Sequence, residues 1–214
     1  MTGDGDWARH ARASTAAQSQ PHLARRSRAN AQSRAMPTPP LSFRAATAAD
    51  APAIAEIYNH AVLHTTAIWN DLTVDAANRA QWLTQRQADG FAVLVATDET
   101  GQVLGYAAYG PWRSFDGYRH TVENSIYVHP GAHRRGVGRQ LLAALIERAQ
   151  QQGLHVMVAA IEAGNAPSIA LHAAQGFVET GRMAEVGCKF GRWLDLVFLQ
   201  RKLSVDAQPP MAQR

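Results

Sequence analysis

Hydrophobic and polar positions alternate most regularly in a stretch that predicts a strand, a turn and a helix between residues 121 and 152. One face of the strand carries Val122, Asn124, Ile126 and Val128, and the other carries Glu123, Ser125 and Tyr127. This period of two residues is typical of a β-strand, and Pro130 ends it. After Gly138, apolar residues return with helical spacing and stop at Gly153, which predicts a helix.

The flanking patterns predict one α/β domain in which helices and strands are interleaved. Strands are expected at residues 41–44, 91–96, 102–109, 154–161, 177–179 and 193–203. Helices are expected after the capping sequence at 47–50, after Asp75, and at 166–175. A loop that holds Lys189 and Arg192 is expected between the last two strands.

The two ends of the chain differ from its body in composition. Residues 1–40 are rich in Ala, Ser, Gln and Arg, and such a segment cannot bury enough apolar surface to fold. We therefore expect a disordered extension at 1–40, a folded domain at 41–203 and a flexible tail at 204–214. A transit peptide is disfavoured by Asp4 and Asp6, and Met36 is an alternative first residue.

Charge and cysteine content narrow the functional class. The formal net charge is +4, but residues 1–35 alone hold six arginines against two aspartates, so the body of the chain is neutral. We therefore expect no nucleic-acid partner. No run approaches the ~20 apolar residues of a membrane span, so no membrane partner is expected either. The single Cys188 excludes an intramolecular disulfide and favours the cytoplasm, and no metal site is predicted.

The first turn of the predicted helix has the features of an anion site. Gly136 and Gly138 allow a ligand to approach the backbone closely, where the first helical N–H groups are unpaired. Three arginines lie in the same turn: Arg134, Arg135 and Arg139. These features favour phosphate binding over the alternative that the glycines only shape a tight turn.

Two other phosphate-binding motifs fit less well. A dinucleotide fingerprint would need glycine or alanine at Leu141, and a nucleoside-triphosphate loop would need a lysine after the glycines.

The glycine-rich turn is part of a wider resemblance that covers residues 41–203. Val128-His-Pro followed by HRRGVGRQLL resembles the pyrophosphate motif of the GNAT acetyltransferases, and NAPSIALH at 165–172 resembles their second cofactor motif. Three further segments resemble the branch that acetylates phosphinothricin, methionine sulfoximine and methionine sulfone: WRSFDGYR at 112–119, TVENS at 121–125 and EVGCKFGRWLD at 185–195. One departure is His133, where the family usually has Gln or Arg.

The resemblance implies a single GNAT-like domain with a mixed central sheet, splayed central strands and flanking helices. It implies acetyl-CoA as the cofactor and a twofold homodimer. The cofactor would contact the backbone of Ile126, Tyr127 and Val128, the loop Arg134, Arg135, Gly136, Val137, Gly138 and Arg139, and the side chains of Asn165 and Ser168. Asn165 is also expected to cap its helix.

Acetyl transfer to an amine needs a group that removes a proton from the amine. Glu123 is the best candidate for this general base, because an unpaired carboxylate on a covered central strand would otherwise be costly. A solvated carboxylate on a polar strand face is the alternative reading. The resemblance implies a secondary catalytic role for His172, near the departing thiolate, although a lone helical histidine is more often structural.

The acceptor of this branch carries a carboxylate and an oxygen-rich sulfur or phosphorus group, so its cleft needs cations and aromatic walls. The substrate-binding candidates are Trp69, Arg113, Phe115, Tyr118, Arg119 and Lys189. Two alternatives remain open: a protein or peptide N-acetyltransferase, and an RNA- or membrane-binding protein acting through the arginine-rich tail.

Overall fold

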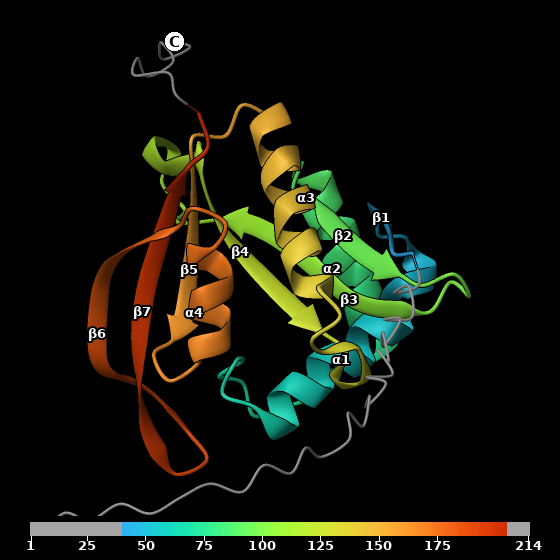
Figure 1. The fold of residues 1–214 in the computed structure, drawn as a ribbon, viewed down its shortest axis with the longest axis horizontal. Coiled ribbons are helices and arrows are strands. Elements are labelled where there is room, and N and C mark those ends of the chain that lie inside the picture. The colour runs from blue at the N-terminus through green and yellow to red at the C-terminus, as the bar shows by residue number, and fades with distance from the viewer. Residues whose placement is uncertain (1–39, 205–214) are drawn as a thin grey trace, which may run out of the picture. The chain divides into compact units, whose positions relative to one another are not determined.

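The computed structural model describes residues 40–204, which form a seven-stranded mixed sheet with helices on both faces (Figure 1). The strand order is β1-β2-β3-β4-β5-β7-β6. The strands are β1 (Ser42–Ala45), β2 (Val93–Thr97), β3 (Val103–Pro111), β4 (Thr121–Val128), β5 (Val156–Glu162), β6 (Val178–Lys189) and β7 (Arg192–Lys202). The helices are α1 (Ala51–His64), α2 (Ala76–Ala88), α3 (Val137–Gln151) and α4 (Ala166–Ala173), with short 3-10 helices η1 (Ala48–Asp50), η2 (Asp116–Tyr118) and η3 (Pro130–Ala132).

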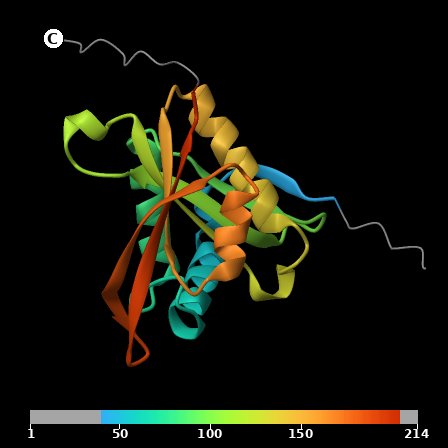
Figure 2. The same cartoon turned by 60° about the vertical axis from the view of Figure 1, so that its left-hand side comes forward.

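Each face of the sheet has its own hydrophobic core. On one face, α3 buries Leu141, Leu142 and Leu145 among residues that include Val122 of β4. On the other face, α1 and α2 bury Ile54, Ile57 and Leu83 against residues of β2 and β3. The ribbon views show the sheet between these two helical layers (Figures 1 and 2). The alternation along β4 explains this arrangement, because successive side chains of a strand enter opposite cores.

The two central strands separate, as the resemblance implies. β4 and β5 are parallel, and their pairing is confined to Thr121↔Val156, Val122↔Met157 and Glu123↔Val158. Beyond these residues β4 pairs only with β3, and β5 pairs only with β7. A gap therefore opens between residues 124–128 of β4 and the second half of β5.

The backbone groups of β4 that face this gap follow from the antiparallel pairing with β3. The N–H of His129 donates to the Leu104 carbonyl (2.9 Å), and the N–H of Trp112 donates to the Thr121 carbonyl (3.3 Å). Odd-numbered residues of β4 therefore direct their N–H and C=O groups toward β3. The backbone groups of Ile126 and Val128 consequently point toward the gap.

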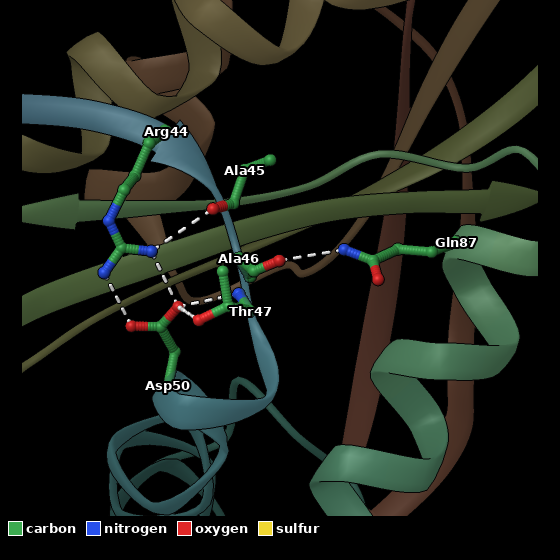
Figure 3. A network of polar contacts seen from close by, with 6 residues as sticks. All are labelled: Arg44, Ala45, Ala46, Thr47, Asp50 and Gln87. Carbon is green, nitrogen blue, oxygen red and sulfur yellow. Dashed lines mark hydrogen bonds and ion pairs between the residues drawn. The ribbon is translucent and has the colours of Figure 1, made fainter.

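The start of the domain is fixed by the capping sequence predicted at 47–50 (Figure 3). The Thr47 N–H donates to the Asp50 carboxylate (2.7 Å), and Arg44 of β1 forms a bidentate ion pair with the same carboxylate (2.7 and 2.8 Å). The Gln87 side chain of α2 donates to the Ala46 carbonyl (2.8 Å). This network ties β1, α1 and α2 together, and the hydrogen bond from Arg44 lowers the pKa of Asp50.

The last two strands differ from the expectation. Residues 177–179 were expected as a short strand before a loop with Lys189 and Arg192, but β6 extends to Lys189. A two-residue turn, Phe190 and Gly191, joins β6 to β7. The φ angles of these two residues are 50° and 69°. Register shifts near Gly181 and Gly187 interrupt the regular alternation of β6, which explains why the sequence pattern did not reveal it.

Three further expectations concern the two ends of the chain, a membrane-spanning segment and a metal site. The disordered extension at 1–40 and the tail at 204–214 fall almost entirely on residues 1–39 and 205–214, which lie outside the described part of the chain. Within residues 40–204, no helix is long and apolar enough to cross a membrane. The same residues contain no cluster of three or more His, Cys, Asp or Glu side chains suited to a metal ion.

Candidate active site

The glycine-rich loop forms an open helix N-terminus beside the end of β4. Gly136 caps α3 with a φ of +77°, and the first hydrogen bond of the helix joins the Gln140 N–H to the Gly136 carbonyl (3.1 Å). The N–H groups of residues 137–139 precede that bond and have no partner within the helix. Gly138 lies beside Val128, so the loop sits where β4 ends.

The charge of this loop suits a phosphate. Arg134 and Arg139 are exposed and Arg135 is half-buried. The basic partners in the ion pairs of the described residues are Arg44, His129 and Arg182, so none of the three loop arginines is paired with a carboxylate. Unpaired N–H groups and three arginines without an ion-pair partner give this turn the features of an anion site.

Asn165 caps α4, as the sequence predicts. Its side-chain oxygen accepts a hydrogen bond from the Ser168 N–H (3.2 Å), and a proline follows at the start of the helix. The second role expected of Asn165 and Ser168, contact with the cofactor, remains a prediction.

On the opposite face of the sheet from α3, Glu123 lines a cavity of about 300 Å³. Glu123 is the last residue of β4 that pairs with β5, so its side chain lies at the point where the strands separate. Burial raises the pKa of Glu123, and the nearby Arg113 and Arg86 lower it. The net increase makes this carboxylate a better proton acceptor than an ordinary exposed glutamate.

Two arginines of α2 line the same cavity and were missed by the sequence analysis. The Arg79 guanidinium lies over the ring of Tyr58 (4.6 Å) and near that of Trp82 (5.1 Å). The guanidinium of Arg86 lies against Gly110, because a Cβ there would lie 1.8 Å from its Nη1. The spacing i, i+3 and i+7 places Arg79, Trp82 and Arg86 on one face of α2. This pattern in the sequence could have indicated that the two arginines face a common site.

The other walls of the cavity are aromatic. Its lining includes Tyr58, Trp82, Tyr106 and Tyr127. Burial raises the pKa of both Tyr106 and Tyr127, so their hydroxyls stay protonated. The cavity therefore combines one carboxylate, two cations and aromatic walls.

The structure does not bring the six predicted substrate residues together at this cavity. None of them is among its lining residues, although Arg113 is close enough to lower the pKa of Glu123. Phe115 and Tyr118 are 75% and 43% exposed in the loop before β4. Arg119 in the same loop is exposed and donates to the Asp116 carbonyl (3.0 Å).

Trp69, in the connection between α1 and α2, and Lys189, at the end of β6, lie where that connection meets the hairpin. The ammonium of Lys189 is buried and donates to the carbonyls of Val62 (2.6 Å) and Ile68. The ring of Trp69 packs on Gly187, where a Cβ would lie 2.1 Å from it. Within one chain, these two residues attach the β6–β7 hairpin to the α1–α2 connection, and burial lowers the pKa of Lys189.

His172 is buried on the α3 side of the sheet. Its Nδ1 lies 2.8 Å from the Ser168 carbonyl and its Nε2 lies 3.0 Å from Oδ1 of Asn124. Burial lowers the pKa of His172, whereas the hydrogen bond to Ser168 raises it. Both ring nitrogens thus already have hydrogen-bond partners.

Two features therefore lie on opposite faces of the splayed sheet: a helix N-terminus suited to an anion and a carboxylate in a cavity. Residues 54–177 match the model of the acetyltransferase (GNAT) family. The chain belongs to this family, and it is an N-acetyltransferase that uses acetyl-CoA.

Sequence relatives and solved structures agree with this assignment. The chain is 57% identical over 169 residues to the L-methionine sulfoximine/L-methionine sulfone acetyltransferase of Salmonella typhimurium, covering 79% of this chain and 98% of that protein. It is 40% identical over 156 residues to the phosphinothricin N-acetyltransferase of Alcaligenes faecalis, covering 72% and 79%.

Among solved structures, an acetyltransferase from Salmonella typhimurium with its cofactor acetyl-CoA has a TM-score of 0.78 and 56% identity, covering 80% of this chain and 99% of that one. A ribosomal-protein-alanine N-acetyltransferase from Brucella melitensis has a TM-score of 0.74 and 58% identity, covering 75% and 99%.

The residues present fit acetyl-CoA. Its pyrophosphate needs the unpaired N–H groups and cations found at 134–139, and its amide-containing arm needs free strand backbone such as that of Ile126 and Val128. Tyr127 was also predicted to make a backbone contact, but its N–H and C=O groups point toward β3. The side chain of Tyr127 lies on the same face of β4 as Glu123 and forms part of the wall of the Glu123 cavity.

Proposed function

We propose that this enzyme acetylates the α-amino group of a small amino-acid-like substrate of the methionine sulfoximine, methionine sulfone or phosphinothricin type. The observation that carries the proposal is the cavity of about 300 Å³ in which Glu123 lies among Arg79, Arg86 and aromatic rings. Such a cavity suits a small zwitterion, because it offers a base for the amine and cations for the acid groups. The names of the sequence relatives support the same class of substrate.

In the proposed mechanism Glu123 removes a proton from the substrate ammonium, directly or through a water, so that the free amine can attack the thioester. The C–N bond forms, the C–S bond breaks, and the CoA thiolate leaves and takes up the second proton that the amine loses. Acetyl-CoA supplies the acetyl group in activated form. Residues 134–139 hold its pyrophosphate, the backbone of Ile126 and Val128 holds its arm, and Asn165 and Ser168 contact it. An N–H of Ile126 or Val128 stabilises the oxyanion that develops on the acetyl carbonyl. Arg113 supports the negative charge of Glu123 from the adjacent loop.

A panel of acceptors tests this proposal. Acetyl-CoA consumption would be measured with methionine sulfone, methionine sulfoximine, phosphinothricin and several N-terminal peptides. We expect kcat/KM to be highest for one of the three amino-acid analogues. A higher value for a peptide would instead favour the alternative of a protein N-acetyltransferase, for which the name of the Brucella melitensis relative is the specific support.

Removal of the Arg86 charge is expected to weaken binding of the acceptor but not of acetyl-CoA. A charged hydrogen bond to the substrate carboxylate contributes about 1.5–3 kcal/mol. The Arg86→Met variant should therefore raise the KM of the amino acid about 10- to 150-fold. The control is the carboxamide of the same substrate, whose KM should be the same for wild type and variant. An unchanged KM for the free acid would exclude Arg86 as the anchor.

We further propose that the enzyme is a homodimer formed through the β6–β7 hairpin. β6 is an edge strand, and nearly all of its residues are exposed. Five large apolar side chains of the hairpin are exposed: Val178, Met183, Val186, Phe190 and Trp193. An unpaired edge and this much apolar surface are typical of a protein interface. A twofold arrangement would also let Phe115, Tyr118 and Arg119 of one subunit approach the site of its partner.

The free, exposed Cys188 and the use of acetyl-CoA support a cytoplasmic location.

A chain that starts at Met36 is expected to run as a dimer in light scattering and to retain full acetyl transfer. The physical reason is that the proposed interface and all candidate site residues lie within 41–203. The Trp193→Glu variant is expected to be monomeric, because it would bury two unpaired carboxylates in a symmetric interface. A monomeric mass for the Met36 chain at micromolar concentration would rule out the dimer, and lost activity would assign a function to residues 1–35.

A further inference from the structure

The side chain of Asn124 occupies the point where β4 and β5 separate. The pairing of the two strands ends at Glu123↔Val158, and Asn124 is the next residue of β4. Asn124 is only 8% exposed, and its Nδ2 donates to the Val158 carbonyl (2.9 Å). A side-chain amide, instead of a further strand pair, thus follows the last residue of the parallel ladder.

Asn124 is itself held by α4. Its Oδ1 lies 3.0 Å from Nε2 of His172, and the other ring nitrogen lies 2.8 Å from the Ser168 carbonyl. His172 is 3% exposed, and its ring packs edge to face with that of Phe177, with the ring centroids 5.0 Å apart. A continuous chain of contacts therefore runs from β5 through Asn124 and His172 to the helix that Asn165 caps.

One end of this chain fixes the orientation of Asn124. The Val158 carbonyl only accepts, so the Asn124 amide donates to it and turns its oxygen toward His172. A neutral His172 ring with its proton on Nε2 donates to that oxygen.

The hydrogen bond from Asn124 to the Val158 carbonyl allows β4 and β5 to separate beyond residue 123. Two neighbouring parallel strands gain hydrogen bonds by pairing further, and a buried carbonyl without a partner costs free energy. The amide of Asn124 gives the Val158 carbonyl a partner that does not require β4 and β5 to remain adjacent. His172 prevents this amide from rotating away.

We propose that Asn124 is a positioning residue: held by His172, it sets the point at which β4 and β5 separate and thereby keeps open the gap that receives the acetyl-CoA thioester. The proposal rests on the placement of acetyl-CoA in this gap under the proposed function. It does not require His172 to transfer a proton.

The first test compares two asparagines that differ in place but not in chemistry. The Asn59 side chain also makes two hydrogen bonds to backbone, donating to the Val74 carbonyl (2.8 Å) and accepting from the Val74 N–H (2.9 Å), but it lies in α1. Calorimetry would measure acetyl-CoA affinity, and thermal unfolding would measure Tm. We expect Asn124→Ala to raise the acetyl-CoA Kd at least tenfold and Asn59→Ala to leave it within twofold, while both lower Tm.

An acetyl-CoA Kd within twofold of wild type for a folded Asn124→Ala variant would overturn the proposal, because the pair would then serve only stability. If Asn124→Ala does not fold, Asn124→Asp gives the same measurement. Aspartate keeps the shape and the acceptor for His172 but has no N–H for the Val158 carbonyl. No amine is present in the titration, so the result does not depend on which acceptor the enzyme uses.

The second test addresses His172. Glutamine can donate an amide N–H to Asn124, whereas phenylalanine fills the space of the ring without a donor. We expect His172→Gln to bind acetyl-CoA within threefold of wild type and His172→Phe to match Asn124→Ala. The double variant Asn124→Ala/His172→Phe should be no worse than either single one. Wild-type affinity in His172→Phe would show that Asn124 does not need this partner and would overturn the proposal.

Discussion

The Glu123→Gln variant is expected to lose about 10²- to 10⁴-fold in turnover at neutral pH while binding acetyl-CoA like wild type. Glutamine has almost the same shape as glutamate but cannot accept the proton of the substrate ammonium. Glu123 also lies on the face of the sheet opposite the anion site of α3, so cofactor affinity should not change. Turnover at saturating substrate and calorimetric affinity for acetyl-CoA are the two measurements. Turnover within a few-fold of wild type would show that Glu123 is not the base.

The pH dependence of the same variant separates a base from a merely structural carboxylate. Because burial raises the pKa of Glu123, the wild-type enzyme should lose activity on acidification at a higher pH than an ordinary glutamate would allow. In the variant no carboxylate takes the proton, so the reaction starts from amine that is already free. That fraction is about a tenth at pH 7 and approaches unity above the amine pKa of about 7.7–8.0. The deficit of Glu123→Gln should therefore shrink by up to about tenfold as the pH rises, whereas Glu147→Gln, an exposed residue of α3, should match wild type throughout.

The fold was predictable from the sequence wherever one local pattern determined one element. The strand at 121–128 was expected at the bounds that the structure shows, because its alternation serves two separate cores. The caps at Asp75 and Asn165 followed from single residues, and both side chains accept the expected hydrogen bonds. β6 was not predictable in the same way. It is exposed on an edge and interrupted by register shifts, so no buried face imposes a period on its sequence.

The site was predictable in part, for a related reason. Glu123 and the glycine-rich turn are neighbours in the sequence, and their chemistry is visible in one segment. The arginines of α2 line the same cavity as Glu123 only because α2 packs on that face of the sheet, and only the tertiary structure shows that they share it. Lys189 shows the opposite case. Its charge suggested a substrate contact, but within one chain the hairpin carries its ammonium to the Val62 carbonyl.

The second large effect is expected for Gly136→Val, which should weaken acetyl-CoA binding while leaving the Glu123 cavity intact. Gly136 has a φ of +77°, a conformation that a β-branched residue adopts only under strain. A strain of about 1–3 kcal/mol corresponds to roughly 5- to 150-fold in affinity if the loop relaxes away from its binding conformation. The added side chain would also stand in the space through which a pyrophosphate approaches the N–H groups.

Gly153→Val is the matched control for this variant. Gly153 follows the same helix at its other end and has a φ of +71°, and a Cβ added there would meet no atom of the described residues within 4 Å. Its substitution therefore introduces similar backbone strain without approaching the anion site, and the two variants should lose similar amounts of thermal stability. Calorimetry should then show a raised acetyl-CoA Kd for Gly136→Val alone. Equal affinities in the two variants would mean that the loop at 134–139 does not bind the pyrophosphate, because strain at either end of α3 would then have the same consequence.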